Sequence, residues 1–328
     1  MIIPLVRAKY VYAYAAVLDR LGAPKRRLLE GVGLSERVFE DPEVIIPAHQ
    51  AWGFIGRAAE QEGIDDLGFV AGELSIADYG AFSSQLLQVP NLNQALEAFC
   101  RLALHEYSRA DFYLSRSDQG TWFCRGPIDG DAAQRKHVEL LLLTMMIATV
   151  RLVAGPHWQP SLVFLQTAES ACVQEHRLLS RSDLRFGNGV TAFEVPAHLL
   201  SKQLPTPLTS TAKPDYRPLE HEFPIAIRQV VECMIHNRVP RIGSLADALG
   251  TSIRTLQRRL SDMDETFTGI LETARMTSAN RLITNGDHSV NEIAQKLGYS
   301  GQAHFTRAFR RWNGVSPTTF RRLHATSN

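Results

Sequence analysis

Two copies of one short pattern lie in the last third of this 328-residue chain. "LADALGTS" (245–252) and "IAQKLGYS" (293–300) share an apolar residue, Ala, Leu, Gly and Ser at corresponding places, at an offset of 48. Glycine ends helices by taking up a left-handed backbone, so each copy predicts a short helix, a glycine turn and a second helix. Two helices joined in this way form a helix-turn-helix. The chain is therefore expected to contain two such units.

The residues around the pattern predict where each unit begins and ends. Gly250 and Gly298 are the expected turns, and the second helices should begin near Ser252 and Ser300. Two capping boxes, in which paired side chains satisfy the free amides of a helix start, are expected at Ser244-x-x-Asp247 and Ser289-x-x-Glu292. We predict the two units at about residues 244–261 and 289–311.

The segment between the units predicts a spacer helix. Its 17 residues, 267–283, give roughly 25 Å of helix at 1.5 Å per residue. That length suits a frame that holds two helices in successive major grooves, about 34 Å apart. After the second unit, Ser316 and Pro317 predict the start of a last helix.

Both second helices carry polar residue types that read DNA. Arginine pairs with guanine and amide side chains pair with adenine in the major groove. We predict base contacts on the face opposite the apolar positions, from Arg254, Gln257, Arg258, Gln302, His304 and Arg307. The predicted phosphate contacts are Ser252, Thr255, Thr306 and Arg310. The partner is then double-stranded DNA.

The distribution of charge agrees with a polyanionic partner. The chain has a net charge of only +1, but residues 221–328 hold 14 Lys and Arg against 9 Asp and Glu, and 13 of the 14 are arginine. Residues 1–220 have a net charge of −4. A basic segment of this kind favours nucleic-acid binding, although it also occurs in proteins that are merely soluble.

The N-terminal part predicts an α+β fold. Helices are expected within the first 62 residues and at about 91–105, 132–154 and 170–180. Alternating stretches predict antiparallel strands, with one hairpin at residues 117–120 and another around Gly187-Asn188-Gly189. The fold class is thus an α+β N-terminal domain with helices and an antiparallel sheet, followed by an all-α double helix-turn-helix domain.

A proline-rich stretch divides the chain. "LPTPLTSTAKPDYRPLEHEFP" has five prolines in 21 residues and almost no apolar periodicity, which is typical of a linker. We predict three parts: a sensing and dimerisation domain at 1–204, the linker at 205–223 and the DNA-binding domain at 224–328.

Residues from about 225 to 323 resemble the DNA-binding domain of the AraC family of bacterial transcriptional regulators. The likeness is carried by "SLADALGTSIRTLQRRL", "ARMTSANRLI" and "SVNEIAQKLGYSGQAHFTRAFRRWNGVSPTTFR". It implies that the two second helices enter adjacent major grooves and that the six residues named above contact bases. Ser278 stands where the family commonly has arginine before Ala279, and Ala303 stands where a base-reading amide can occur.

The N-terminal part resembles the longer sensor domain of the branch of that family which includes ornithine-utilisation and virulence regulators. "YGAFSSQLLQVPNLNQALEAFCRL" and "DLRFGNGVTAFEVPAHLLSKQLP" carry this likeness. It implies a domain that binds a small molecule of unspecified chemistry and contributes to a homodimer. RNA polymerase is a further expected partner of such a regulator. Activation is the expected effect on transcription, and the sequence leaves repression open as the alternative.

An effector pocket is expected between the helices and the sheet of the N-terminal part. Its candidate residues combine aromatic side chains with polar groups in mostly apolar stretches, and ordinary core packing is the competing interpretation for each. The candidates are Tyr79, Phe82, Arg101, His105, Trp122 and His137.

The motifs of common enzymes are not found in the sequence. We find no GxSxG, HExxH, P-loop or GxGxxG, and the four cysteines are too far apart for a disulfide framework or a zinc site. We therefore expect no enzyme activity, no cofactor and no metal. Two alternatives stay open: an N-terminal domain with catalytic activity, and a helical adaptor.

No segment of the sequence predicts secretion or membrane insertion. Charges at Arg7, Lys9 and Asp19 interrupt the apolar N-terminus, unlike a signal peptide. The longest apolar run, 140–150, is too short to span a bilayer and predicts a buried helix. We expect a cytoplasmic protein without a membrane partner.

Overall fold

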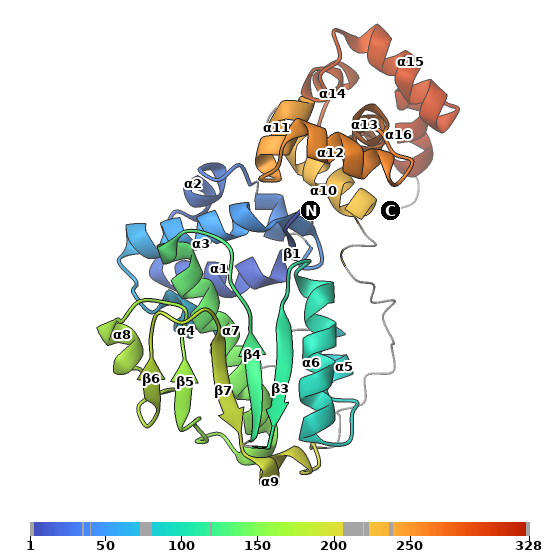
Figure 1. Ribbon diagram of the computed structural model, residues 1–328. Coiled ribbons are helices and arrows are strands. Elements are labelled where there is room, and N and C mark those ends of the chain that lie inside the picture. The colour runs from blue at the N-terminus through green and yellow to red at the C-terminus, as the bar shows by residue number, and fades with distance from the viewer. Residues whose placement is uncertain are drawn as a thin grey trace.

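The structure, a computed structural model, has an α+β N-terminal region and an all-α C-terminal region (Figure 1). This is the predicted fold class. We call residues 3–205 the N-terminal region and residues 223–325 the C-terminal region. The structure describes residues 3–34, 36–39, 41–72, 81–118, 120–205, 219, 223–235 and 239–325.

Helices form most of the N-terminal region. The first long ones, α1 (Lys9–Leu21) and α3 (Ala48–Glu62), end at Gly22 and Gly63, whose φ angles of +70° and +66° are left-handed. The remaining helices of this region are α2 (Lys25–Glu30), η1 (Glu36–Phe39), α4 (Leu67–Gly72), α5 (Ala81–Leu86), α6 (Leu92–Glu106), α7 (Ala132–Ala154), α8 (Ala171–Gln174) and α9 (Ala197–Leu200).

The central helix α7 confirms the predicted buried helix. Asp131 caps it by accepting a hydrogen bond from the Gln134 N–H at 2.9 Å. Within the described residues it is the one helix long and apolar enough to cross a membrane, but 67% of its most apolar stretch is buried inside the protein. A helix that is apolar on all sides and packed in this way is typical of a protein core.

Five strands form the main sheet in the order β3-β4-β7-β5-β6. The hairpin of β3 (Phe112–Ser117) and β4 (Gly120–Arg125) is as predicted. The second predicted hairpin is wrong, because β5 (Leu162–Phe164) lies between β6 (Asp183–Arg185) and β7 (Thr191–Val195). The chain after β6 wraps around the end of β5, where the N–H groups of Gly187 and Asn188 donate to Thr167 O and Leu165 O. The β5 and β6 strands are parallel, so the sheet is mostly rather than wholly antiparallel.

The helix expected at 170–180 is also shorter than predicted. Only α8 forms there, because Gln159 binds the backbone of the following loop. Its Nε2 donates to Arg177 O at 2.8 Å and its Oε1 accepts from the Arg181 N–H at 2.9 Å. These hydrogen bonds hold the loop in a non-helical path between α8 and β6.

A small second sheet connects the two regions. Strand β1 (Leu5–Arg7) pairs with β2 (Ile45–Pro47) in antiparallel fashion, and β2 packs on α10 (Phe223–Ile235), the first helix of the C-terminal region. The Ile45 N–H donates to Gln229 Oε1 at 2.9 Å. Ile3, Leu5 and Ile45 are buried in the same apolar cluster as α10, so the two regions share a core at this point. Most of the predicted linker lies outside the described residues.

The C-terminal region is wholly helical where it is described. After α10 come α11 (Ile242–Ala248), α12 (Ile253–Ser261), α13 (Phe267–Asn285), α14 (Val290–Lys296), α15 (Gln302–Asn313) and α16 (Pro317–Ala325). The helix α13 confirms the predicted spacer, and its 19 residues correspond to about 28 Å. The start of α16 is also as predicted, since Ser316 Oγ accepts from the Thr319 N–H at 3.2 Å.

Candidate nucleic-acid interface and ligand cavity

The helix pairs α11–α12 and α14–α15 have the same turn. Gly250 and Gly298 have φ angles of +60° and +73°, which favour glycine. In the first unit the Thr251 N–H donates to Ala246 O at 2.9 Å, and in the second the Tyr299 N–H donates to Ala294 O at 2.9 Å. These two hydrogen bonds are 48 residues apart in the sequence, so the repeat of the sequence is a repeat of the backbone.

The first residues of α11 and α14 confirm one predicted capping box and correct the other. In the second unit Ser289 and Glu292 form the expected capping box, with Ser289 N–H donating to Glu292 Oε2 at 2.7 Å and Glu292 N–H to Ser289 Oγ at 3.2 Å. In the first unit the capping box at Ser244 and Asp247 is wrong, because α11 already begins at Ile242. Ser244 instead occupies the place of Glu292, and its Oγ accepts from the Arg241 N–H at 3.0 Å. The offset of 48 therefore holds for the caps as well.

The three predicted base-contacting residues of α12 are exposed. Leu256 and Leu260 are buried on the inner side, while Arg254, Gln257 and Arg258 face solvent. Arg259 turns inward and lies over the Phe223 ring of α10, 5.4 Å from its centroid. The helix therefore presents one polar face and uses its other arginine for packing.

The predicted phosphate contacts of α12 belong to its cap. Ser252 Oγ accepts from the Thr255 N–H at 3.1 Å and lies 2.9 Å from Thr255 Oγ1. Ser252 is exposed and Thr255 is half-buried. Both hydroxyl groups sit at the N-terminus of a helix, where backbone amides attract anions.

The second helix of the other unit, α15, presents a similar face. Phe305 and Phe309 are fully buried, while Gln302, His304, Arg307 and Arg310 are exposed and Thr306 is half-buried. Arg307 Nη2 lies 3.0 Å from His304 Nδ1, so these two predicted base contacts are neighbours. Ala303 is also exposed, which leaves its methyl group free for apolar contact with a base.

The spacer α13 fixes the second unit through side chains. Arg275 donates from Nε to Leu297 O at 3.1 Å and lies over the Tyr299 ring. Glu272 accepts from Trp312 Nε1 at 3.0 Å and pairs with Arg311. Ser278 is fully buried in α13, so the position where the family commonly has arginine faces the core in this chain and not a phosphate.

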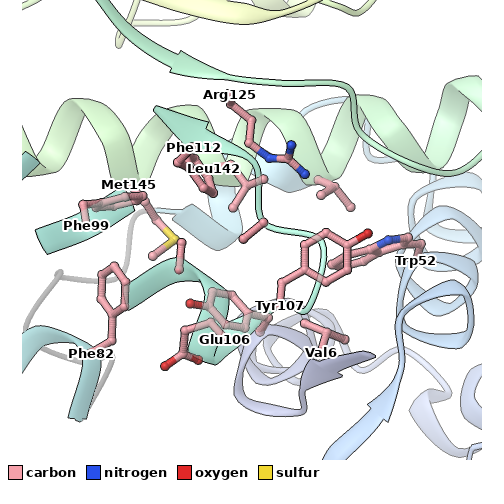
Figure 2. Close-up of a pocket in the computed structure, with 14 residues that line it drawn as sticks. Val6, Trp52, Phe82, Phe99, Glu106, Tyr107, Phe112, Arg125, Leu142 and Met145 are labelled. Carbon is pink, nitrogen blue, oxygen red and sulfur yellow. The ribbon is translucent and has the colours of Figure 1, made fainter. Parts of the chain in front are cut away.

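A cavity lies in the N-terminal region between α6, α7, β3 and β4, where a pocket was expected (Figure 2). It is small, with a volume of about 30 Å³. Its walls are mostly apolar or aromatic, and Trp52 and Tyr107 meet edge to face with ring centroids 5.6 Å apart. The lining residues are Val6, Tyr10, Trp52, Phe82, Phe99, Ala103, Glu106, Tyr107, Ala110, Phe112, Arg125, Val138, Leu142 and Met145.

Two charged side chains are buried in these walls. Arg125, at 1% exposure, donates from Nη1 to Gly126 O and Pro127 O at 3.0 and 3.2 Å and lies over the Phe112 ring. Its Nε has no hydrogen-bond partner among the described residues, and burial lowers the pKa of this guanidinium. Burial raises the pKa of Glu106 to about 7, even though Lys9 Nζ lies 2.8 Å from its Oε1.

The predicted pocket residues are not all brought together. Phe82 lines the cavity, whereas Arg101 is exposed and His105 is half-buried outside the lining. His137 is buried on α7 away from the cavity, and burial lowers its pKa to about 4. Tyr79 lies outside the described residues.

Strand alternation explains why Trp122 does not line the cavity and Arg125 does. Successive side chains of a strand point to opposite faces, so Phe123 and Arg125 share the inner face of β4. Trp122 is on the other face, where it packs against Phe164 with ring centroids 5.4 Å apart. The alternation of side chains in "GTWFCR" was the sequence signal that would have placed Arg125, and not Trp122, on the face of the cavity.

Comparison with known proteins gives two matches to protein families. Residues 22–204 match a model of the arabinose-binding N-terminal domain of AraC transcription regulators, and residues 245–323 match a helix-turn-helix domain. Together the two matches cover the cavity lining except Val6 and Tyr10, and both helix-turn-helix units except the first residues of α11.

Several curated regulators are similar to parts of the chain. The transcriptional regulator VqsM of Pseudomonas aeruginosa is 36% identical over 41% of this chain and 44% of its own length. The ornithine utilization regulator of the same species is 35% identical over 25% of this chain and 24% of its own. VirS of Mycobacterium tuberculosis is 26% identical over 52% of this chain and 53% of its own. The chain thus spans about half or less of the length of these relatives.

Proposed function

Because the chain belongs to the AraC family of transcription regulators, we propose that it binds double-stranded DNA at specific sequences and regulates transcription. The observation that carries this proposal is the repeated unit itself. Two helix-turn-helix units with the same turn each present a polar second helix, and α13 connects them. We call α12 and α15 the reading helices.

The exposed faces of the reading helices support base readout in two successive major grooves. Arg254, Gln257 and Arg258 would contact one block of bases, and Gln302, His304 and Arg307 a second block. Each good contact from such a side chain gives about 1–3 kcal/mol of discrimination. Ser252, Thr255, Thr306 and Arg310 would contact phosphates and set the register without reading sequence. Since the two units are not identical, the site would be non-palindromic.

We further propose that a small molecule bound in the cavity controls DNA binding. The printed hydrogen bonds of the buried Arg125 guanidinium go to backbone oxygens, and the charges of Asp111 and Asp129 act on it without a direct ion pair among the described residues. A buried charge that lacks a directly bonded counter-charge is costly. An apolar molecule with an anionic group would supply that charge while its body contacts Phe99, Phe112 and Leu142. The cavity is too small for such a molecule, with a volume of about 30 Å³, so the side chains around it would have to move. Met145 suits such a change because methionine adapts its shape easily.

The strand β1 supports a route from the cavity to the reading helices. Val6 lines the cavity, and the preceding residue on the strand, Leu5, is buried in the cluster that contains α10. A shift of β1 would therefore act on both cores.

The proposed division of the chain is a sensing and dimerisation domain at 1–204, a linker at 205–223 and a DNA-binding domain at 224–328. We also propose that the protein is a cytoplasmic homodimeric activator that contacts RNA polymerase, and not an enzyme or an adaptor.

The test is selection of bound duplexes from a random pool by the full chain at about 0.15 M salt, the physiological ionic strength. We expect enrichment of a site with two blocks of preferred bases one helical turn apart. The Arg258→Ala variant should lose preference in one block and Arg307→Ala in the other. The matched control is Arg20→Ala, which removes an exposed arginine of the N-terminal region.

Loss of preference in both blocks by either variant would contradict the assignment of one block to each helix. Binding that depends on salt but selects no sequence would contradict the proposed function. In that case the two units would be a helical scaffold, and the adaptor alternative would return.

A further inference from the structure

A second hollow lies on another face of α7. Val138, Leu142 and Met145 face the cavity described above, whereas Thr144, Ala148 and Arg151 line a cleft of about 680 Å³. The other wall of the cleft is the loop between α8 and β6, which lies at the edge of the sheet beyond β5 (Figure 1). We call this hollow the arginine cleft. Its lining residues are Phe69, Gly72, Thr144, Ala148, Arg151, Leu152, Pro156, His157, Gln159, His176, Arg177, Leu178, Ser180 and Arg181.

The arginine cleft is strongly cationic. Three arginines, Arg151, Arg177 and Arg181, and two histidines line it, and the described lining includes no aspartate or glutamate. Arg151 is half-buried at the end of α7 and donates from Nε to Trp158 O at 2.8 Å. Burial and the nearby charge of Arg177 both lower the pKa of Arg151. Like charges that converge in a concave site repel one another unless an anion lies between them.

Hydrogen bonds fix the backbone of the loop that carries Arg177 and Arg181 before any ligand arrives. Gln159 clamps the loop at both ends, because its amide binds the backbone oxygen of Arg177 and the backbone N–H of Arg181. Ser182 Oγ also donates to Pro160 O at 2.6 Å. A loop fixed by backbone contacts lowers the entropy cost of binding, because its side chains start from the right place.

The floor of the arginine cleft can receive an organic group. His176 lies parallel to the Phe69 ring, with centroids 3.8 Å apart, and Ala148, Leu152 and Leu178 add apolar surface. The volume of the cleft is within the range of small-molecule sites, roughly 300–1,000 Å³. Arginine is the side chain best suited to phosphate, because its planar fork donates two parallel hydrogen bonds.

We infer that the arginine cleft binds a small organic phosphate, or a similar dianion, between Arg151, Arg177 and Arg181. This site is separate from the proposed cavity and from the reading helices, and it gives the N-terminal region a second ligand. The two sites contact different faces of one helix, α7, so a dianion in the cleft acts on the same helix as the molecule in the cavity.

The experiment uses pyrophosphate as the probe and isothermal titration calorimetry on the full chain at constant ionic strength. We expect saturable binding with one site per chain. The double variant Arg177→Ala/Arg181→Ala should bind at least about tenfold more weakly, because each lost charge-assisted hydrogen bond contributes that much or more. Both residues are exposed, so the fold should be retained.

The matched control is Arg185→Ala, which removes an exposed arginine of β6 that is paired with Asp183 outside the arginine cleft. It should bind pyrophosphate as the wild type does. Equal weakening in the control, or no saturable binding beyond that of chloride, would overturn the inference. Binding of a hexaglutamate peptide without binding of pyrophosphate would also overturn it and assign the cleft to an acidic protein segment. None of these measurements involves DNA, so failure here leaves the proposed function untouched.

Discussion

The two helix-turn-helix units share the backbone conformation of their turn but bury different side chains. The first unit closes around Leu256 and Leu260, and its second helix, α12, has nine residues. The second unit closes around Phe305 and Phe309, and α15 has twelve residues. The turn hydrogen bonds, the glycine conformations and the starts of α11 and α14 correspond in both. The difference shows that the turn is fixed by backbone geometry, whereas many apolar residues can fill the space beneath it.

The surroundings of the two units differ as well. A Cβ atom at Gly250, in the turn of the first unit, would lie 3.6 Å from His49 Nδ1 of the N-terminal region. The second unit is instead attached to the spacer by Arg275 and Glu272. The turn of the first unit therefore lies beside the N-terminal region, whereas the second unit is fixed by side chains of the spacer α13.

The largest effect should come from the aromatic interior of the second unit. Phe305→Ala removes a fully buried ring that packs on Tyr299 and Phe309 and should lower the free energy of unfolding by about 4 kcal/mol. Leu256→Ala, at the corresponding place in the first unit, should cost about 3 kcal/mol. Denaturant unfolding of both variants measures the difference. A greater cost for Leu256→Ala would contradict the dependence of the second unit on its rings.

The two turn glycines provide a sharper comparison because the same substitution meets different neighbours. An alanine Cβ at Gly298 would lie 2.3 Å from Val239 Cγ2, whereas at Gly250 the nearest atom is at 3.6 Å. Gly250→Ala should cost about 1 kcal/mol from the left-handed backbone alone. Gly298→Ala should cost about 3 kcal/mol, since overpacking adds to that strain. Thermal unfolding of the two variants should show the difference, and equal costs would mean that Val239 moves aside freely.

The reading helices should contribute similarly to DNA binding despite their different interiors. Arg258→Ala and Arg307→Ala should each weaken binding to the selected site by about 1–3 kcal/mol. The loss should be largest for duplexes with the preferred base at the contacted position. Titration of a labelled duplex measures both effects. A uniform loss over all sequences, with a smaller dependence on salt, would make that arginine a phosphate contact instead.

The smallest effect concerns the helix starts. Ser289→Ala removes the N-cap of α14 and should cost about 1 kcal/mol. Ser244→Ala should lower the free energy of unfolding by less. Ser244 lies inside α11, and its hydroxyl only accepts the hydrogen bond from the Arg241 N–H. Chemical unfolding followed by circular dichroism can compare them. A larger loss for Ser244→Ala would mean that the first helix depends on this residue more than its geometry indicates.

The sequence predicted the C-terminal fold better than the N-terminal fold for a physical reason. The turns at Gly250 and Gly298 and the spacer α13 depend on local signals such as caps, left-handed glycines and helical periodicity. The first capping box failed because two serines, Ser244 and Ser289, were matched by residue type at an offset of 45, whereas the units repeat at 48. Local signals thus identify a helix more reliably than they identify its first residue.

The errors in the N-terminal region came from contacts between distant residues. The hairpin around Gly187-Asn188-Gly189 has the right turn residues, but β5 inserts between its strands. The cavity likewise gathers residues as far apart as Val6, Trp52 and Arg125. No short stretch of sequence indicates that residues so far apart in the chain come into contact. Alternation in β4 was the exception, since it separates Arg125 from Trp122 without any knowledge of the fold.

The shared core at β1, β2 and α10 has a consequence for anyone who exchanges parts between regulators of this family. A cut in the proline-rich stretch would separate Leu5 and Ile45 from the residues of α10 that bury them, and it would put an unmatched helix against Ile45. A join before Ile242 would break a second set of contacts, because α10 also packs on α13 and its Phe223 ring lies under Arg259 of α12. A functional hybrid should therefore transfer α10 with the reading helices and match the residues of β1 and β2 that cover it.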